Sequence, residues 1–231
     1  MDIIRIIKYF ENEYSSWIFK DGGRKMLNRL ALFIKKLNNI ERRKFYDFII
    51  NQISNEKEYY SLSSCLVEEI NDIELTDRFF NIYNSKKDII DKHRKYEMIM
   101  SLLKLRYFKG KDIYSDYVEN HYLKEPKNSF HLIVLYTLIN ENNGINLLVD
   151  YYSKHYKFIE LPPDIISSKE MFLFSTFKKE TDILKNLLLE LKNLNKVVYI
   201  QLKSVLLGCL NSGFNKDIGK NEYTIISNIL S

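Results

Sequence analysis

Small residues and chain breakers are scarce in this sequence of 231 residues. It contains one alanine (Ala31), 3 prolines, 7 glycines and 2 cysteines. Sandwiches and barrels need turn residues between many short strands, so the shortage of proline and glycine argues against an all-β fold. Helices joined by polar turns remain as the expected fold class.

The two cysteines and the N-terminal segment each exclude a further class. Cys65 and Cys209 both occupy apolar positions of helical patterns, so we expect both thiols to be buried and reduced rather than bonded or metal-bound. Asp2, Arg5 and Lys8 interrupt the N-terminal isoleucines, which argues against a signal peptide, and no apolar run is long enough to span a bilayer. We therefore expect a cytoplasmic protein with no membrane contact.

The residues that are abundant indicate a folded chain with a compositional bias. Hydrophobic residues make up 45% and charged residues 28%, an ordinary globular balance. The sequence has 27 lysines against 8 arginines, together with many asparagines and isoleucines, as an AT-rich genome tends to encode. Part of the net charge of +5 is therefore expected from codon usage rather than from function.

Apolar residues recur at steps of three and four along nearly the whole chain, the spacing of one face of an α-helix. The clearest example is segment 24–38, where apolar residues from Met26 to Leu37 share one face and cations share the other. Gly144 is expected to separate two helices, and the segment 161–164 (Leu-Pro-Pro-Asp) to end one helix and begin another. The helices predicted from the pattern are 2–19, 24–38, 41–54, 57–71, 75–84, 88–108, 112–123, 126–140, 144–157, 163–177, 181–193, 196–211 and 219–230.

Grouped in pairs, these helices begin near 24, 57, 88, 126, 163 and 196, at spacings of 33, 31, 38, 37 and 33 residues. This loose period resembles that of HEAT-like helical repeat proteins, in which each antiparallel pair buries its apolar face against its neighbours. The resemblance covers the whole chain and implies an irregular α-solenoid in one all-α domain over 1–231. Tetratricopeptide repeats are disfavoured because Ala31 is the only alanine available for their tight packing. A compact helical bundle is the alternative.

No pattern of residues predicts a catalytic or metal centre. The four histidines are scattered, and the nearest metal-like pair is His121 with Glu125, for which a solvated pair is the ordinary interpretation. Asp112, Asp116 and Glu119 form an acidic stripe at steps of four and three, which would do chemistry only if buried. Asp21-Gly22-Gly23 is better explained as a helix end than as a phosphate loop, so we expect no cofactor and lean against an enzyme.

A basic segment stands out against this background. Residues 20–44 hold nine cations and two acids, a local net charge of +7, and all eight arginines precede residue 107. Lys25, Arg29 and Lys36 fall on one helical stripe that suits phosphates or an acidic protein, although a solvated face explains them equally well. The predicted binding residues are Arg24, Lys25, Arg29, Lys35, Lys36, Arg42 and Arg43.

Three function classes follow, in decreasing order of preference. The first is a non-enzymatic protein-binding module, which resembles in style the small bacterial immunity and adaptor proteins that inhibit or scaffold a partner; its basic charge would imply an acidic or neutral target. The second is nucleic-acid binding through the basic helix face. The third is a DNA-repair glycosylase of HEAT-like fold, a resemblance that implies tryptophans around a lesion, whereas Trp17 is the only tryptophan and has the neighbours of a core residue.

Overall fold

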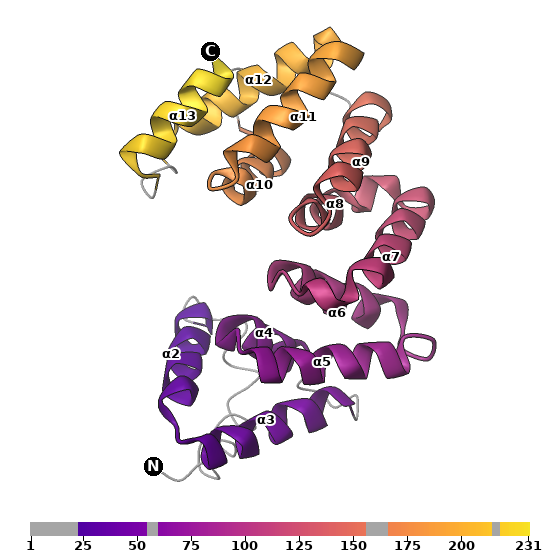
Figure 1. The fold of residues 1–231 in the computed structure, drawn as a ribbon, viewed down its shortest axis with the longest axis vertical. Helices are drawn as coiled ribbons and strands as arrows, with labels where there is room; N and C mark the ends of the chain where they lie inside the picture. Colours follow the sequence, from indigo (N-terminus) through magenta and orange to yellow (C-terminus); the bar gives the residue numbers. More distant parts are fainter. Residues whose placement is uncertain (1–22, 55–59, 156–165, 214–217) are drawn as a thin grey trace. The chain divides into compact units, whose positions relative to one another are not determined.

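The computed structural model describes residues 23–54, 60–155, 166–213 and 218–231 (Figure 1). Within these ranges the chain forms twelve α-helices and two short 3-10 helices, and no strand. The expected all-α fold class is therefore confirmed. The helix predicted over 2–19 lies outside the described residues.

The chain divides into two compact units, Met1–Tyr107 and Phe108–Ser231, and the single domain predicted over 1–231 remains a prediction. The helices of unit 1 are α2 (Gly23–Lys36), α3 (Asn39–Ser54), α4 (Tyr60–Ile70), α5 (Ile73–Lys86) and α6 (Lys92–Lys104). Those of unit 2 are η1 (Phe108–Gly110), α7 (Lys111–Lys124), η2 (Pro126–Asn128), α8 (Phe130–Thr137), α9 (Glu141–Lys154), α10 (Ser168–Phe177), α11 (Thr181–Leu194), α12 (Lys196–Asn211) and α13 (Lys220–Leu230).

In unit 1 each helix packs on its successor and also on the helix after that. Helix α2 packs on α4, α4 on α6 and α3 on α5, so the helices form two alternating rows. Side-chain hydrogen bonds cross these rows at nearly constant sequence separation: Ser101 Oγ donates to Glu68 over 33 positions, and Arg78 donates to Asp47 over 31. These separations match the spacing of the predicted helix pairs, so consecutive pairs are stacked.

Unit 2 shows the same alternation. Helices α8, α10 and α12 pack in sequence, and so do α9, α11 and α13, while α8 also packs closely on α9. Figure 1 shows α11, α12 and α13 lying side by side in orange to yellow. The core is apolar, with Leu148, Leu187 and Leu202 fully buried. Helix α8 is buried except at His131, whereas α11 and α13 each keep exposed residues on which a binding surface can be built.

Side-chain caps set several helix starts. Asp72 Oδ1 accepts hydrogen bonds from the backbone N–H of Glu74 (2.9 Å) and Leu75 (3.3 Å), which satisfies the first turn of α5. Asp91 caps α6 in the same way, so that helix begins at Lys92 rather than at the predicted residue 88. A cap outweighs a continuing apolar pattern because it pairs N–H groups that the helix itself leaves free.

The prediction that Gly144 separates two helices is wrong, because Gly144 lies inside α9. A Cβ atom built at Gly144 would lie 2.5 Å from Thr137 Cα and 2.3 Å from its Oγ1, so glycine is required by the close approach of α8 and α9. The helix end and start expected at 161–164 lie outside the described residues; the described helix α10 begins at Ser168 behind the cap Ser167.

Candidate functional site

Helix α2 carries most of the predicted basic face. Arg29, Lys35 and Lys36 are exposed, and the side chains of residues 24 and 25 lie outside the described part. Lys35 Nζ donates to the carbonyl oxygen of Glu69 at 3.4 Å, which directs this cation along the protein surface toward α4.

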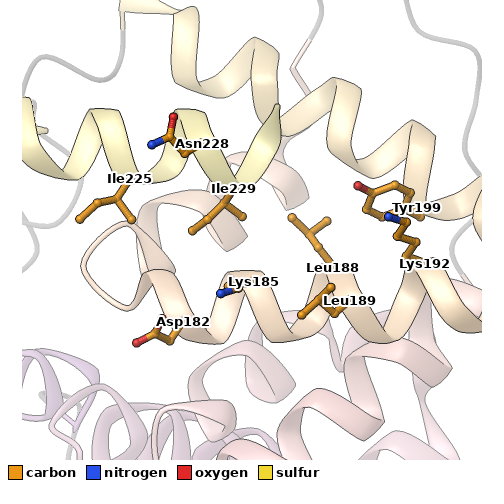
Figure 2. Close-up of a pocket in the computed structure, with 9 residues that line it drawn as sticks. All are labelled: Asp182, Lys185, Leu188, Leu189, Lys192, Tyr199, Ile225, Asn228 and Ile229. Atoms are coloured by element: carbon orange, nitrogen blue, oxygen red, sulfur yellow. The ribbon is translucent and has the colours of Figure 1, made fainter.

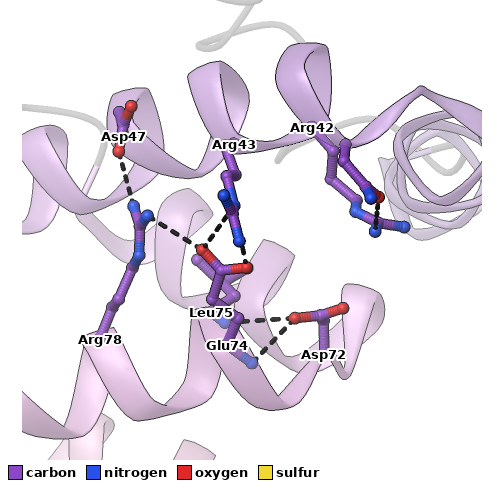
Figure 3. A network of polar contacts seen from close by, with 8 residues as sticks. Arg42, Arg43, Asp47, Asp72, Glu74, Leu75 and Arg78 are labelled. Carbon is purple, nitrogen blue, oxygen red and sulfur yellow. Dashed lines mark hydrogen bonds and ion pairs between the residues drawn. The ribbon is translucent and has the colours of Figure 1, made fainter.

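On α3 one of the two predicted cations, Arg43, meets an acidic partner from α5 (Figure 3). Arg43 Nε lies 3.4 Å from the Glu74 carboxylate, and Arg78 bridges the same carboxylate (3.0 Å) to Asp47 (2.6 Å). The Arg43 and Glu74 side chains are 66% and 40% exposed, so solvent screens their pairing and it contributes little stability. The ion pair gives the Arg43 guanidinium a carboxylate partner within the protein, so a phosphate or a partner's carboxylate would have to compete with Glu74 for it.

The structure therefore divides the predicted basic face. Arg42 donates to Asn39 Oδ1 at 2.6 Å. Arg29 and Lys36 form no hydrogen bond or ion pair within the described residues; they are seven residues apart on α2, two helical turns or about 10.5 Å. Among the predicted cations whose side chains the structure describes, Arg43 alone pairs with a carboxylate, while Lys35 and Arg42 donate to neutral oxygens and keep their charge.

A second surface, which the sequence did not predict, lies between α11, α12 and α13 (Figure 2). It is a hollow of about 470 Å³, named here the C-terminal groove. Its lining residues are Asp182, Lys185, Leu188, Leu189, Lys192, Tyr199, Ile225, Asn228 and Ile229. Six of these nine residues are exposed, so the groove is open to solvent along its length.

The C-terminal groove combines an apolar interior with lysines. Leu189 and Ile225 are each 47% exposed and line the groove from facing helices, α11 and α13. Lys192 Nζ lies 5.9 Å from the centre of the Tyr199 ring, within the range of a cation–π contact. Lys185 has no carboxylate or other polar partner among the described residues.

One signal in the sequence could have indicated this groove. On α11 the buried stripe is formed by Leu184, Leu187, Leu188 and Leu191. Leu189 lies about 100° around the helix from Leu188, so it is an apolar residue set apart from that stripe on the solvent-facing side of α11. The opposing isoleucines come from α13, about forty residues later, so the pairing itself is visible only in the fold.

The buried histidine is structural. His121 Nδ1 lies 2.7 Å from Ser129 Oγ and Nε2 lies 4.0 Å from the Glu125 carboxylate, an order that superficially resembles a serine–histidine–acid triad. However, Ser129 is fully buried and its hydroxyl donates to the Glu125 carbonyl at 2.8 Å. This serine cannot reach a substrate, so the three residues serve to join α7 to α8.

The other chemical candidates gain no support. Asp112, Asp116 and Glu119 are all exposed on α7, and the described residues contain no group of acidic, histidine or cysteine side chains that could hold a metal ion. Trp17 lies outside the described residues.

The expectation for the cysteines is half wrong. Cys209 is buried, and burial together with the nearby Glu170 carboxylate raises the pKa of its thiol to about 12. Cys65 is exposed, because α4 turns Leu66, Val67 and Ile70 into the core and leaves Cys65 on its outer side.

Comparison with known proteins adds no assignment: no protein family, curated protein or solved structure matches this chain. Among the described helices, none has both the length and the apolar composition needed to cross a bilayer.

Proposed function

We propose that this chain is a protein-binding module without catalytic activity and that the C-terminal groove is its docking surface. The observation that carries the proposal is the pair of large apolar side chains, Leu189 and Ile225, left 47% exposed on facing helices. Exposed apolar surface rimmed by polar groups is typical of sites where another macromolecule binds. A small ligand is disfavoured, because such ligands are usually buried over most of their surface and this groove is open.

The architecture supports the same function. The alternating helix rows and the side-chain links over about one pair length favour an irregular α-solenoid of HEAT-like type. Such stacks present long, rigid surfaces on which partners dock. A bacterial immunity or adaptor protein, which inhibits or scaffolds its partner, would use a surface of this kind.

Site-specific photo-crosslinking tests the proposal. A photoreactive amino acid at Leu189 should give a defined crosslinked protein in the source cells, because Leu189 lines the groove. The matched control is the same amino acid at Leu123, a leucine that is 78% exposed on α7 outside the groove. Crosslinks of equal yield and identity at both positions would contradict docking in the groove.

Nucleic-acid binding is the second candidate, favoured by the exposed cations Arg29 and Lys36, which form no hydrogen bond or ion pair within the described residues. If they contact phosphates, replacing both with glutamate should reduce the slope of log affinity against log salt by about 2. Glu74→Gln should steepen the slope by about 1, because it releases Arg43 from its carboxylate. A chain that binds no nucleic acid at low salt would eliminate this candidate.

A further inference from the structure

We propose that the occupant of the C-terminal groove is an amphipathic acidic α-helix of a partner protein, with two carboxylates spaced two helical turns apart. This inference rests on the proposed function and adds the chemistry of the partner. It follows from the order of charges and apolar side chains along α11.

The two lysines of α11 define a spacing. Lys185 and Lys192 are seven residues apart, so they lie on the same side of the helix, about 10.5 Å from one another along its axis. Both are exposed, and neither forms an ion pair within the described residues. Carboxylates at positions i and i+7 of an adjacent helix would meet both.

Apolar side chains line the groove between the two lysines. Leu188 and Leu189 lie between the lysines on α11, and Ile225 and Ile229 project from successive turns of α13 into the same hollow (Figure 2). An amphipathic helix places its apolar residues at steps of three and four, which matches both walls. Apolar burial would supply the affinity, and the lysines would select an acidic partner.

The remaining charge in the groove gives the occupant a direction. Asp182 precedes Lys185 by one turn and lines the same end of the groove. A partner helix with a lysine or arginine one turn beyond its outer carboxylate would pair with Asp182 in one orientation only. In the reverse orientation Asp182 would face no partner cation.

Two other occupants fit less well. A second copy of this chain related by a two-fold axis would bring Lys185 and Lys192 against the same lysines, and like charges disfavour such an interface. A nucleic acid would find the lysines but would leave the leucines and isoleucines without a complementary surface. An acidic helix satisfies both kinds of side chain.

The test measures binding of labelled helical peptides to the full chain by fluorescence anisotropy. All peptides carry the same leucine stripe; two glutamates are placed two turns apart or one turn apart, and a third peptide has lysines in the two-turn positions. We expect the two-turn acidic peptide to bind roughly ten-fold more tightly than either of the others. Equal binding of the acidic and lysine peptides would overturn the proposal.

Charge reversal makes the test specific to the groove. Lys185→Glu with Lys192→Glu should transfer the preference to the lysine peptide, whereas Lys124→Glu with Lys127→Glu, an equal change of charge on exposed residues outside the groove, should leave it unchanged. The glutamine pair at 185 and 192 should remove the preference without creating a new one. A preference that survives charge reversal would overturn the proposal.

The remaining outcomes separate this proposal from the proposed function. A partner crosslink at Leu189 with no preference for acidic peptides retains the docking surface and rejects the acidic helix. Self-association in sedimentation that Leu189→Glu abolishes would assign the groove to a second copy and overturn the proposal. Tighter binding of dodecanoate than of any peptide would overturn both proposals in favour of a small amphiphile.

Discussion

The basic face of unit 1 and the C-terminal groove of unit 2 both carry exposed cations, but they differ in what surrounds them. On α3, Arg43 lies beside Glu74, which is also held by Arg78. On α11, Lys185 and Lys192 flank exposed leucine and face α13 without a carboxylate between them. A cluster of cations in the sequence therefore does not show which of them lack a carboxylate partner in the fold, nor which lie beside exposed apolar side chains as Lys185 and Lys192 do.

The two cysteines allow this comparison to be followed in solution, because each unit contains one. Cys65 in unit 1 is exposed, although partial burial of its thiol and the nearby Glu68 carboxylate raise its pKa, whereas Cys209 in unit 2 is 2% exposed and its pKa is raised to about 12. A bulky thiol reagent should therefore label Cys65 at least about 100-fold faster than Cys209, since labelling of Cys209 requires both an opening of unit 2 and a thiolate. Quantitative mass spectrometry over time checks the ratio. Similar rates at the two thiols would show that the helix faces of α4 or α12 are misassigned.

Gly144 tests whether unit 2 depends on close helix packing. The Gly144→Ala substitution places a methyl group against the backbone of Thr137, and we expect a loss of about 2 kcal/mol in the free energy of unfolding. Labelling of Cys209 should accelerate by roughly thirty-fold, while Cys65 should be unaffected. Gly213→Ala is the matched control, because no atom lies within 4 Å of the added methyl group. Equal stability of the two variants in urea would contradict the packing described for α8 and α9.

The sequence predicted correctly those features that depend on the residues of a single helix, such as its existence and its bounds. The helices expected at 181–193 and 196–211 are found as α11 (Thr181–Leu194) and α12 (Lys196–Asn211), because a sustained period of 3.6 requires only local information. The pairing of Arg43 with a carboxylate could not be predicted from one helix alone. Arg43 and Glu74 are separated by 31 positions, and their contact depends on how α3 packs on α5.

The same limit applies to Gly144 and to the groove. A glycine between two apolar patterns is consistent with a helix break or with a close helix contact, and only the neighbouring Thr137 decides between them. The C-terminal groove requires α13 to leave Leu189 and Ile225 partly uncovered, which no local pattern specifies.

A smaller effect concerns acid stability in unit 2. Burial alone would raise the pKa of Asp150, but hydrogen bonds from Lys154 (2.5 Å) and from the Tyr122 hydroxyl (2.6 Å) outweigh it and lower the pKa. A carboxylate with a lowered folded pKa stabilises the fold above its unfolded pKa of about 3.9, and this contribution is lost as pH falls through the folded value.

Asp150→Asn should therefore flatten the dependence of unfolding free energy on pH below about 4, by less than about 1 kcal/mol because the side chain is partly exposed. Urea titrations followed by circular dichroism across this range measure it. Asp112→Asn, at an exposed position on α7, is the control. A pH profile unchanged by Asp150→Asn would show that the hydrogen bonds to Lys154 and Tyr122 do not persist in solution.

We propose that the C-terminal groove, and not the basic face, binds the partner. Calorimetric titration of the crosslinked partner, once purified, against two double variants tests it directly. Leu189→Glu with Ile225→Glu should weaken binding at least about 100-fold, because it places charges in the apolar centre of the interface. Arg29→Glu with Lys36→Glu should change affinity by less than about three-fold, as expected for cations outside the contact. Loss of binding in the arginine and lysine variant, with full affinity in the leucine and isoleucine variant, would show that the partner binds the basic face instead.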